Sequence, residues 1–122
     1  MARPSAAGAG LTMTKGQEQV IKAWVNGRKK TAGNIVTDGH SIYYHGTELV
    51  RKSGAGKFEM RSAGYGGHVS TRSLLNAVFD IMYGSGAPHV VQRAGNLIVL
   101  FPDADHPDNA WDVWTEGWME WS

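Results

Sequence analysis

The sequence contains no cysteine, and this absence excludes several kinds of chemistry. Without thiols the chain forms no disulfides, no thiolate zinc site and no cysteine nucleophile. The lack of disulfides fits a reducing compartment such as a cytoplasm. With 122 residues, of which 42% are hydrophobic and 10% aromatic, we expect one domain with a single hydrophobic core.

The sequence also lacks a long hydrophobic run. The longest uninterrupted aliphatic and aromatic stretch is LIVLF, residues 97–101, whereas a membrane helix needs roughly 20 such residues. Residues 1–14 are rich in small side chains and lack the apolar stretch of a secretory signal. We therefore predict a disordered lead-in, and a soluble protein that makes no membrane contact.

Basic residues are missing from the last part of the chain. All 12 lysines and arginines lie within residues 1–100, together with five acids, which gives that part a balance of +7. From Phe101 onward there are six acids and no bases, a balance of −6. The net charge of +1 therefore hides a basic body, residues 15–106, and an acidic tail, residues 107–122.

The body begins with a predicted helix over residues 15–25, which Asn26-Gly27 ends. Its apolar face consists of Val20, Ile21, Trp24 and Val25. The basic run Arg28-Lys29-Lys30 follows, and we expect it to be exposed because nothing nearby could neutralise three buried cations.

Three turn signals then predict an antiparallel meander of three or four strands. Asp38-Gly39 is typical of a two-residue hairpin turn, whose central residues need positive φ. His45-Gly46-Thr47 and Gly54-Ala55-Gly56 indicate two further reversals, the second before a strand near residues 57–63. Which side chains share a face of this sheet depends on the register, which we leave open.

A second helix and a hairpin complete the predicted body. The helix runs from about Thr71 to Tyr83, is capped by Ser70 or Thr71, and ends at Gly84. Residues 89–101 indicate a hairpin around Ala94-Gly95 with a buried second strand. We predict an α+β fold: a small antiparallel sheet, made of the meander and the C-terminal hairpin, packed by one central helix, with short N- and C-terminal helices.

Four of the five tryptophans lie in the tail. Their spacings of three, four and three predict an acidic amphipathic helix over residues 107–122. The stripe either docks on the body and completes the core, or binds a second chain, because tryptophan is favoured at binding hot spots. An acidic aromatic tail could also imitate nucleic acid and screen the basic body. The tail residues concerned are Trp111, Trp114, Trp118 and Trp121.

Basic and aromatic residues of the body form an alternative binding surface. Tyrosines beside lysines and arginines are typical of proteins that hold single-stranded nucleic acid by base stacking. The other interpretation is that these residues are ordinary solvated strand positions. The candidates are Arg28, Lys29, Lys30, Tyr43, Tyr44, Arg51, Lys52, Lys57, Arg61 and Arg72.

Catalytic and metal motifs are scarce. The sequence has neither a GxSxG elbow nor an HExxH motif, and we expect no enzyme, no cofactor and no dedicated metal site. A third hypothesis is a small metal-dependent hydrolase that uses the loop DADHPDNAWD, although this loop lacks the glycine and glutamate of an EF-hand. Its oxygen- and nitrogen-bearing residues are Asp103, Asp105, His106, Asp108 and Asp112.

The stretches GNIVTDGHSIYYHGTELV and STRSLLN carry a resemblance. They resemble a group of short, uncharacterised proteins encoded mainly by bacteriophages, which have a GN-x-x-TDG turn, a tyrosine-containing strand, a GT step, and a Thr-rich helix start followed by Asn. The matching positions are Gly33, Asn34, Thr37, Asp38, Gly39, Tyr43, Tyr44, Gly46, Thr47, Ser70, Thr71, Arg72 and Asn76.

The resemblance spans residues 24–76 and implies a context, with no activity attached to it. It implies a small viral accessory protein in a bacterial cytoplasm, where binding and inhibiting host components is a common task. Our leading hypothesis is a non-catalytic accessory protein that binds a host protein through the tail tryptophans. A single-stranded nucleic-acid-binding protein is the alternative, and the oligomeric state is left open.

Overall fold

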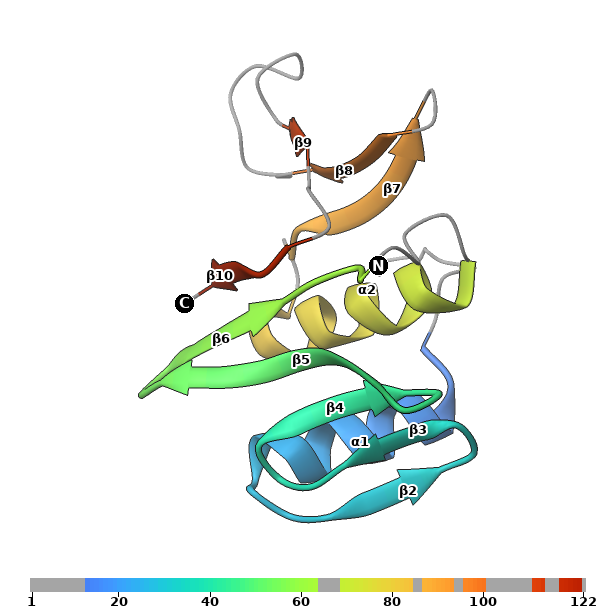
Figure 1. The fold of residues 1–122 in the computed structure, drawn as a ribbon, viewed down its shortest axis with the longest axis vertical. Coiled ribbons are helices and arrows are strands. Elements are labelled where there is room, and N and C mark those ends of the chain that lie inside the picture. Colours follow the sequence, from blue (N-terminus) through green and yellow to red (C-terminus); the bar gives the residue numbers. More distant parts are fainter. Residues whose placement is uncertain are drawn as a thin grey trace.

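The computed structural model describes residues 13–63, 69–84, 87–93, 96–100, 111–113 and 117–121, which form two helices and two antiparallel sheets (Figure 1). The fold is α+β, as predicted. The elements are α1 (Lys15–Val25), β2 (Lys30–Ala32), β3 (Ile35–Thr37), β4 (Ser41–Tyr44), β5 (Thr47–Gly54), β6 (Lys57–Met60), α2 (Val69–Tyr83), β7 (His89–Arg93), β8 (Asn96–Leu100), β9 (Trp111–Val113) and β10 (Met119–Trp121).

Helix α1 begins with a capping box. The Gln17 backbone N–H donates to Thr14 Oγ1 over 3.0 Å, and the Thr14 backbone N–H donates to Gln17 Oε1 over 2.9 Å. These two bonds satisfy backbone donors that the first turn of a helix leaves unpaired. The predicted apolar face is confirmed except at Val25, which is 44% exposed because it is the last residue of the helix.

The meander is longer than predicted. Strands β2 to β6 pair in chain order, and β10 adds to β6, so the large sheet has the order β10-β6-β5-β4-β3-β2. The basic run before β2 is exposed, as expected. Strand β2 itself was not predicted, because it has only three residues, which come directly before the Gly33-Asn34 turn. It forms one edge of the sheet.

The turns of the meander differ in length. Three residues, 38–40, connect β3 and β4, and Thr37 pairs with Ile42, so the prediction of a two-residue turn at Asp38-Gly39 is wrong. The prediction at His45-Gly46 is confirmed, since Tyr44 pairs with Thr47 and both central residues have positive φ. The reversal between β5 and β6 is also confirmed.

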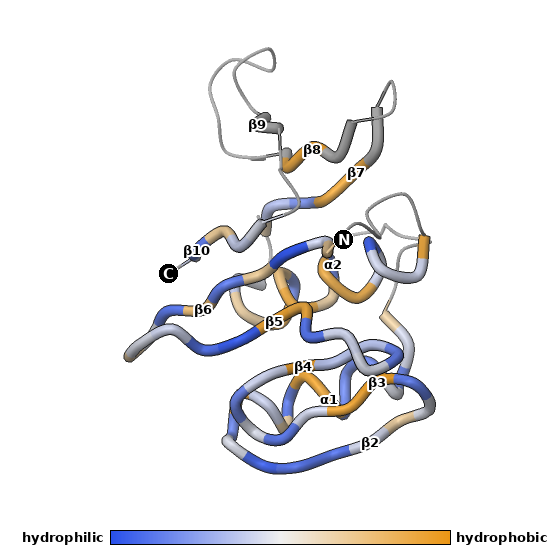
Figure 2. Tube along the Cα trace, in the orientation of Figure 1, coloured by the Kyte–Doolittle hydropathy of each residue, from blue (hydrophilic) through white to orange (hydrophobic). Residues whose placement is uncertain are grey.

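Both helices lie on the same side of the six-stranded sheet (Figure 1). Figure 2 shows apolar stretches of α1 and α2 beside apolar stretches of the central strands, whereas β2 is hydrophilic. The largest fully buried side chains come from both layers: Val20, Ile21, Trp24, Ile42, Leu49, Val50, Phe58, Met60, Leu74, Leu75, Val78 and Phe79. Trp24 contacts Phe58 edge to face, with ring centroids 5.9 Å apart.

Helix α2 confirms the central-helix prediction, with a start two residues earlier than expected. Ser70 and Thr71 therefore lie inside its first turn, where Thr71 is buried. Gly84 ends the helix with a φ of 71°, and its N–H donates to the Asp80 carbonyl over 2.8 Å. The predicted hairpin after α2 is confirmed as β7–β8, which β9 extends to a three-stranded sheet.

The predicted C-terminal helix is wrong. Residues 111–113 form β9, which pairs with β8, and residues 119–121 form β10, which pairs with β6. A helix would leave the free edge of β6 unpaired, whereas β10 saturates its backbone hydrogen bonds. Gly117, which lies between the two strands, also disfavours a continuous helix. The lead-in, residues 1–12, lies outside the described residues.

Candidate binding surface on the open sheet face

The large sheet has one face that neither described helix covers. Residues directly opposite each other in neighbouring strands share a face. Met60, Val50 and Ile42 form one such row and are buried under the helices. The next row, Glu59, Arg51 and Ser41, therefore faces away from them. We call this second side the open face; it carries Ser41, Tyr43, Glu48, Arg51, Glu59, Arg61, Trp118 and Glu120.

A β-bulge in β5 determines which side chains reach the open face. Ile42 pairs with Val50 and Tyr43 with Glu48, so Leu49 is an extra residue on β5. Leu49 and Val50 are both buried as a result. The bulge therefore allows Glu48 and Arg51, three positions apart, to lie on the same side.

Two arginines contact a single tryptophan on the open face. The Cζ atom of Arg51 lies 3.8 Å from the Trp118 ring centroid, and that of Arg61 lies 4.5 Å from it. Both distances are within the range of cation–π contacts. We call this group the Arg-Trp stack. It joins the end of the chain to β5 and to the residue that follows β6.

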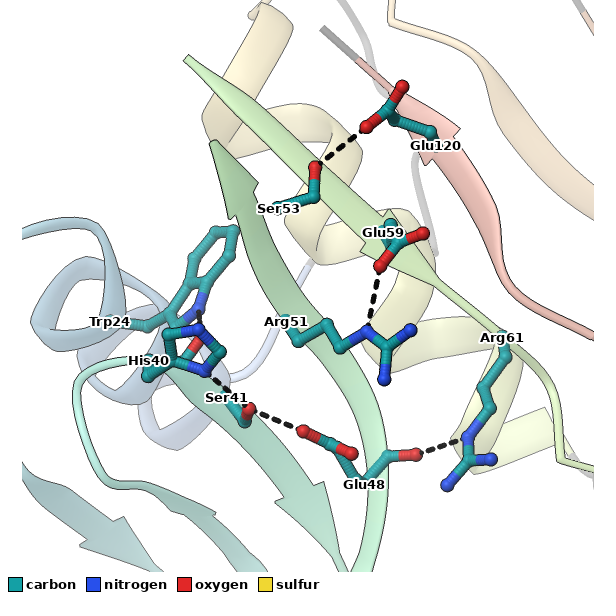
Figure 3. A network of polar contacts seen from close by, with 9 residues as sticks. All are labelled: Trp24, His40, Ser41, Glu48, Arg51, Ser53, Glu59, Arg61 and Glu120. Atoms are coloured by element: carbon teal, nitrogen blue, oxygen red, sulfur yellow. Dashed lines mark hydrogen bonds and ion pairs between the residues drawn. The ribbon is translucent and has the colours of Figure 1, made fainter. Parts of the chain in front are cut away.

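Hydrogen bonds fix both guanidinium groups of the stack (Figure 3). Arg51 Nε donates to Glu59 Oε1 over 2.7 Å, and Arg61 Nε donates to the Glu48 carbonyl over 2.7 Å. Farther along the same face, the Ser53 hydroxyl donates to Glu120 Oε2 over 2.9 Å. The surface is thus preorganised, since its long side chains are held before any partner arrives.

A histidine, a serine and a glutamate form a hydrogen-bonded chain at the border of the open face (Figure 3). His40 Nδ1 lies 3.1 Å from Ser41 Oγ, which donates to Glu48 Oε2 over 2.5 Å. The Ser41 hydroxyl therefore donates its one proton to Glu48 and not to His40. A nucleophilic serine instead gives its proton to a histidine base. This arrangement, with Ser41 buried, therefore positions side chains and does not activate a nucleophile.

The turn before β4 holds a carboxylate in its ionised form. The Ser41 and His40 backbone N–H groups donate to Asp38 Oδ1 over 2.8 and 2.9 Å. These two bonds, the Ser41 bond first, lower the pKa of the Asp38 carboxyl below its usual value. The Tyr43 hydroxyl donates a long hydrogen bond of 3.4 Å to Asp38 Oδ2 of the same carboxylate.

The residues predicted to bind nucleic acid do not form one surface. Tyr43, Arg51 and Arg61 share the open face. Strand alternation places Tyr44 and Lys52 on the helix side, where the Lys52 ammonium lies 5.7 Å from the Trp24 ring centroid. The others lie elsewhere: Arg28, Lys29 and Lys30 before and in β2, Lys57 next to the β5–β6 turn, and Arg72 on α2.

The tail tryptophans do not form one stripe either. Trp118 lies on the open face, whereas Trp121 contacts Phe79 on the helix side, with ring centroids 4.8 Å apart. Over residues 117–121 the tail thus docks on its own body. The backbone of Trp111 belongs to β9, and the structure does not describe its side chain or any part of Trp114.

Sequence reasoning missed the acids of the open face. Glu48, Glu59 and Glu120 share this face with the two arginines of the stack, and the Glu59 carboxylate pairs with Arg51. Only Glu59 carried a signal, because alternation within β6 places it on the same side as Arg61. The positions of Glu48 and Glu120 depend on the bulge in β5 and on the pairing of β10 with β6, which are long-range features.

The proposed metal loop falls largely outside the described residues. Asp103, Asp105, His106 and Asp108 are not described, and of Asp112 only the backbone in β9 is. Among the residues that the structure does describe, no three His, Asp or Glu side chains gather around a common point suited to a metal ion. Within the same residues, neither helix is long and apolar enough to cross a membrane.

Comparisons of the chain with known protein families, with curated proteins and with solved structures find no match.

Proposed function

We propose that the protein is a non-catalytic binding protein whose open face contacts a protein partner. The observation that carries the proposal is the Arg-Trp stack on a sheet face without a covering helix. Tryptophan, tyrosine and arginine are the residue types most enriched at binding hot spots. Trp118, Tyr43 and the two arginines supply all three types on one face.

The charge of the open face favours a protein over a nucleic acid. Arg51 and Arg61 are accompanied by three carboxylates, from Glu48, Glu59 and Glu120. A surface that binds phosphates needs uncompensated cations. A mixed surface of this kind instead complements a protein with charges of both signs. In keeping with the expected phage context, we propose that the partner is a host protein whose activity the contact inhibits.

The first experiment is affinity capture from a bacterial lysate, followed by a binding titration with the captured protein. We expect a retained partner whose affinity falls at least about tenfold in Tyr43→Ala and in Arg61→Gln, the loss typical of hot-spot truncation. Lys22→Gln is the matched control, because Lys22 lies on α1, on the other side of the sheet, and is exposed. Circular dichroism must show that each variant is folded.

Single-stranded nucleic acid is the second candidate, because the Trp118 indole stacks on two guanidinium groups much as a base could. Nuclease treatment of the lysate separates the two candidates. Capture that disappears after nuclease, together with oligonucleotide affinity that falls steeply with salt, would replace the protein partner by nucleic acid. Equal capture by wild type and both open-face variants would contradict either use of the open face.

A further inference from the structure

A cleft of about 330 Å³ lies on the helix side of the large sheet, away from the open face. Val25, which is exposed, and Met82, which is half-buried, form its apolar walls above the buried side chains of Trp24 and Phe58, so α1, β6 and α2 meet there. The β5–β6 turn, residues 54–56, forms another wall. The volume is at the lower end of the range of small-ligand sites.

The charged residues of the cleft are all cations. Lys52 and Lys57 belong to its lining, and none of the described lining residues is acidic. The Lys52 ammonium lies 5.7 Å from the Trp24 ring centroid. Neither lysine forms an ion pair with any residue that the structure describes. A cation above an apolar floor selects a ligand with two parts, one apolar and one anionic.

We propose that this cleft binds a small amphiphilic anion, whose apolar part packs against Val25 and Met82 and whose acidic group pairs with Lys52. The site is separate from the open face, so the proposal does not depend on the proposed function.

One glycine in the wall provides a way to block the cleft. At Gly54 the backbone φ is not in the left-handed region, and an added Cβ would meet no atom within 4 Å. A side chain at this position therefore enters free space without backbone strain. Gly56 is unsuitable for the same purpose, because its φ of +70° strains any other residue.

The experiment is a fluorescence titration with two probes that share their rings and differ in charge. Anilinonaphthalene sulfonate carries the anion, and phenylnaphthylamine lacks it. We expect saturable sulfonate binding that Lys52→Met weakens about tenfold, as for the loss of one charge-assisted contact, and that Lys52→Arg retains. Lys52→Met should leave the binding of the uncharged probe unchanged, and Gly54→Leu should weaken the binding of both.

Location and specificity are checked in the same variants. With ¹³C-methyl methionine labelling, the sulfonate should shift the Met82 methyl signal and leave that of Met13, which precedes α1, in place. Lys22→Met is the matched control, because it removes an exposed α1 lysine elsewhere. The proposal is overturned if the sulfonate does not saturate, if Met82 does not shift, or if Lys52→Met and Lys22→Met give the same affinity.

Discussion

Gly39 and Gly46 both have positive φ, but their surroundings differ. Gly39 has a φ of 95°, and a Cβ there would lie 2.7 Å from the Gly27 carbonyl oxygen and 2.8 Å from its carbon. Both atoms belong to the backbone of the turn that ends α1, so they cannot move aside easily. Gly46 has a φ of 81°, but a Cβ there would meet nothing within 4 Å.

These surroundings predict unequal effects of alanine. Gly46→Ala should lower the free energy of unfolding by about 1 kcal/mol, the cost of a left-handed backbone for a residue with a Cβ. Gly39→Ala adds a backbone overlap and should lower it by about 2–4 kcal/mol. Urea unfolding followed by circular dichroism measures both values. Equal losses would show that the turn before β4 does not pack on the end of α1.

Several of the residues that carry the resemblance to phage proteins lie in turns of the meander. Gly33 has a positive φ of 61° in the turn between β2 and β3. The Thr37 hydroxyl donates to the Ser41 carbonyl over 2.7 Å and accepts the Gly39 N–H over 3.0 Å. Asp38 accepts two further N–H groups of the same turn. These residues of the motif therefore account for local structure, whereas the proposed partner contact rests on the open face.

At the scale of elements, a buried side chain of α2 is hydrogen-bonded to the backbone of the three-stranded sheet. Asn76 lies on the mostly apolar buried face of this helix. Its Oδ1 accepts the Val90 N–H over 2.6 Å, and its Nδ2 donates to the Val90 carbonyl over 3.1 Å. The backbone N–H and carbonyl of Val90 are thus both hydrogen-bonded to the Asn76 side chain. The three-stranded sheet is tied to α2 at this point.

Asn76→Ala should lower the free energy of unfolding by about 2–3 kcal/mol, because it leaves two backbone groups of Val90 without partners. Asn26→Ala is the matched control: its Nδ2 donates to the Lys22 carbonyl over 2.9 Å, but the site is exposed. Water replaces that bond, so the loss should stay within about 0.5 kcal/mol. Amide hydrogen exchange should also accelerate in β7 and β8 before the meander is affected. Unchanged protection of β7 would contradict the connecting role of Asn76.

Elements specified by local signals could be predicted from the sequence, and elements specified by distant pairing could not. The apolar face of α1, its stop at Asn26-Gly27 and the His45-Gly46 turn depend on a few neighbouring positions, so their pattern in the sequence was enough to predict them. The prediction for the tail was wrong because its tryptophan spacings fit a helix, whereas pairing with the free edge of β6 favours a strand. The residues of the open face could be predicted only in part for the same reason, since Trp118 contacts Arg51 only when β10 has paired with β6.

At the scale of the whole molecule, β10 forms one edge of the large sheet, although it is far along the chain from the other five strands. Between β6 and β10 the chain forms α2 and the three-stranded sheet. The pairing places Glu120 directly opposite Glu59, which is unfavourable for two like charges. Arg51 offsets this by its ion pair with Glu59, and Ser53 donates to Glu120. The acidic tail is thus accommodated by partners on β5.

The two faces of β10 predict different roles for its neighbouring tryptophans. Trp121→Ala removes an indole that packs on Phe79 in the core and should lower the free energy of unfolding by about 3 kcal/mol. Trp118→Ala removes a partly exposed ring that contacts two arginines and should lower the free energy of unfolding by about 1 kcal/mol. Thermal unfolding of both variants measures these values. Only Trp118→Ala should then yield a folded protein that has lost its partner. If Trp121→Ala is instead as stable as wild type, β10 does not close the sheet, and the tail is free to bind a second chain as the sequence alone allowed.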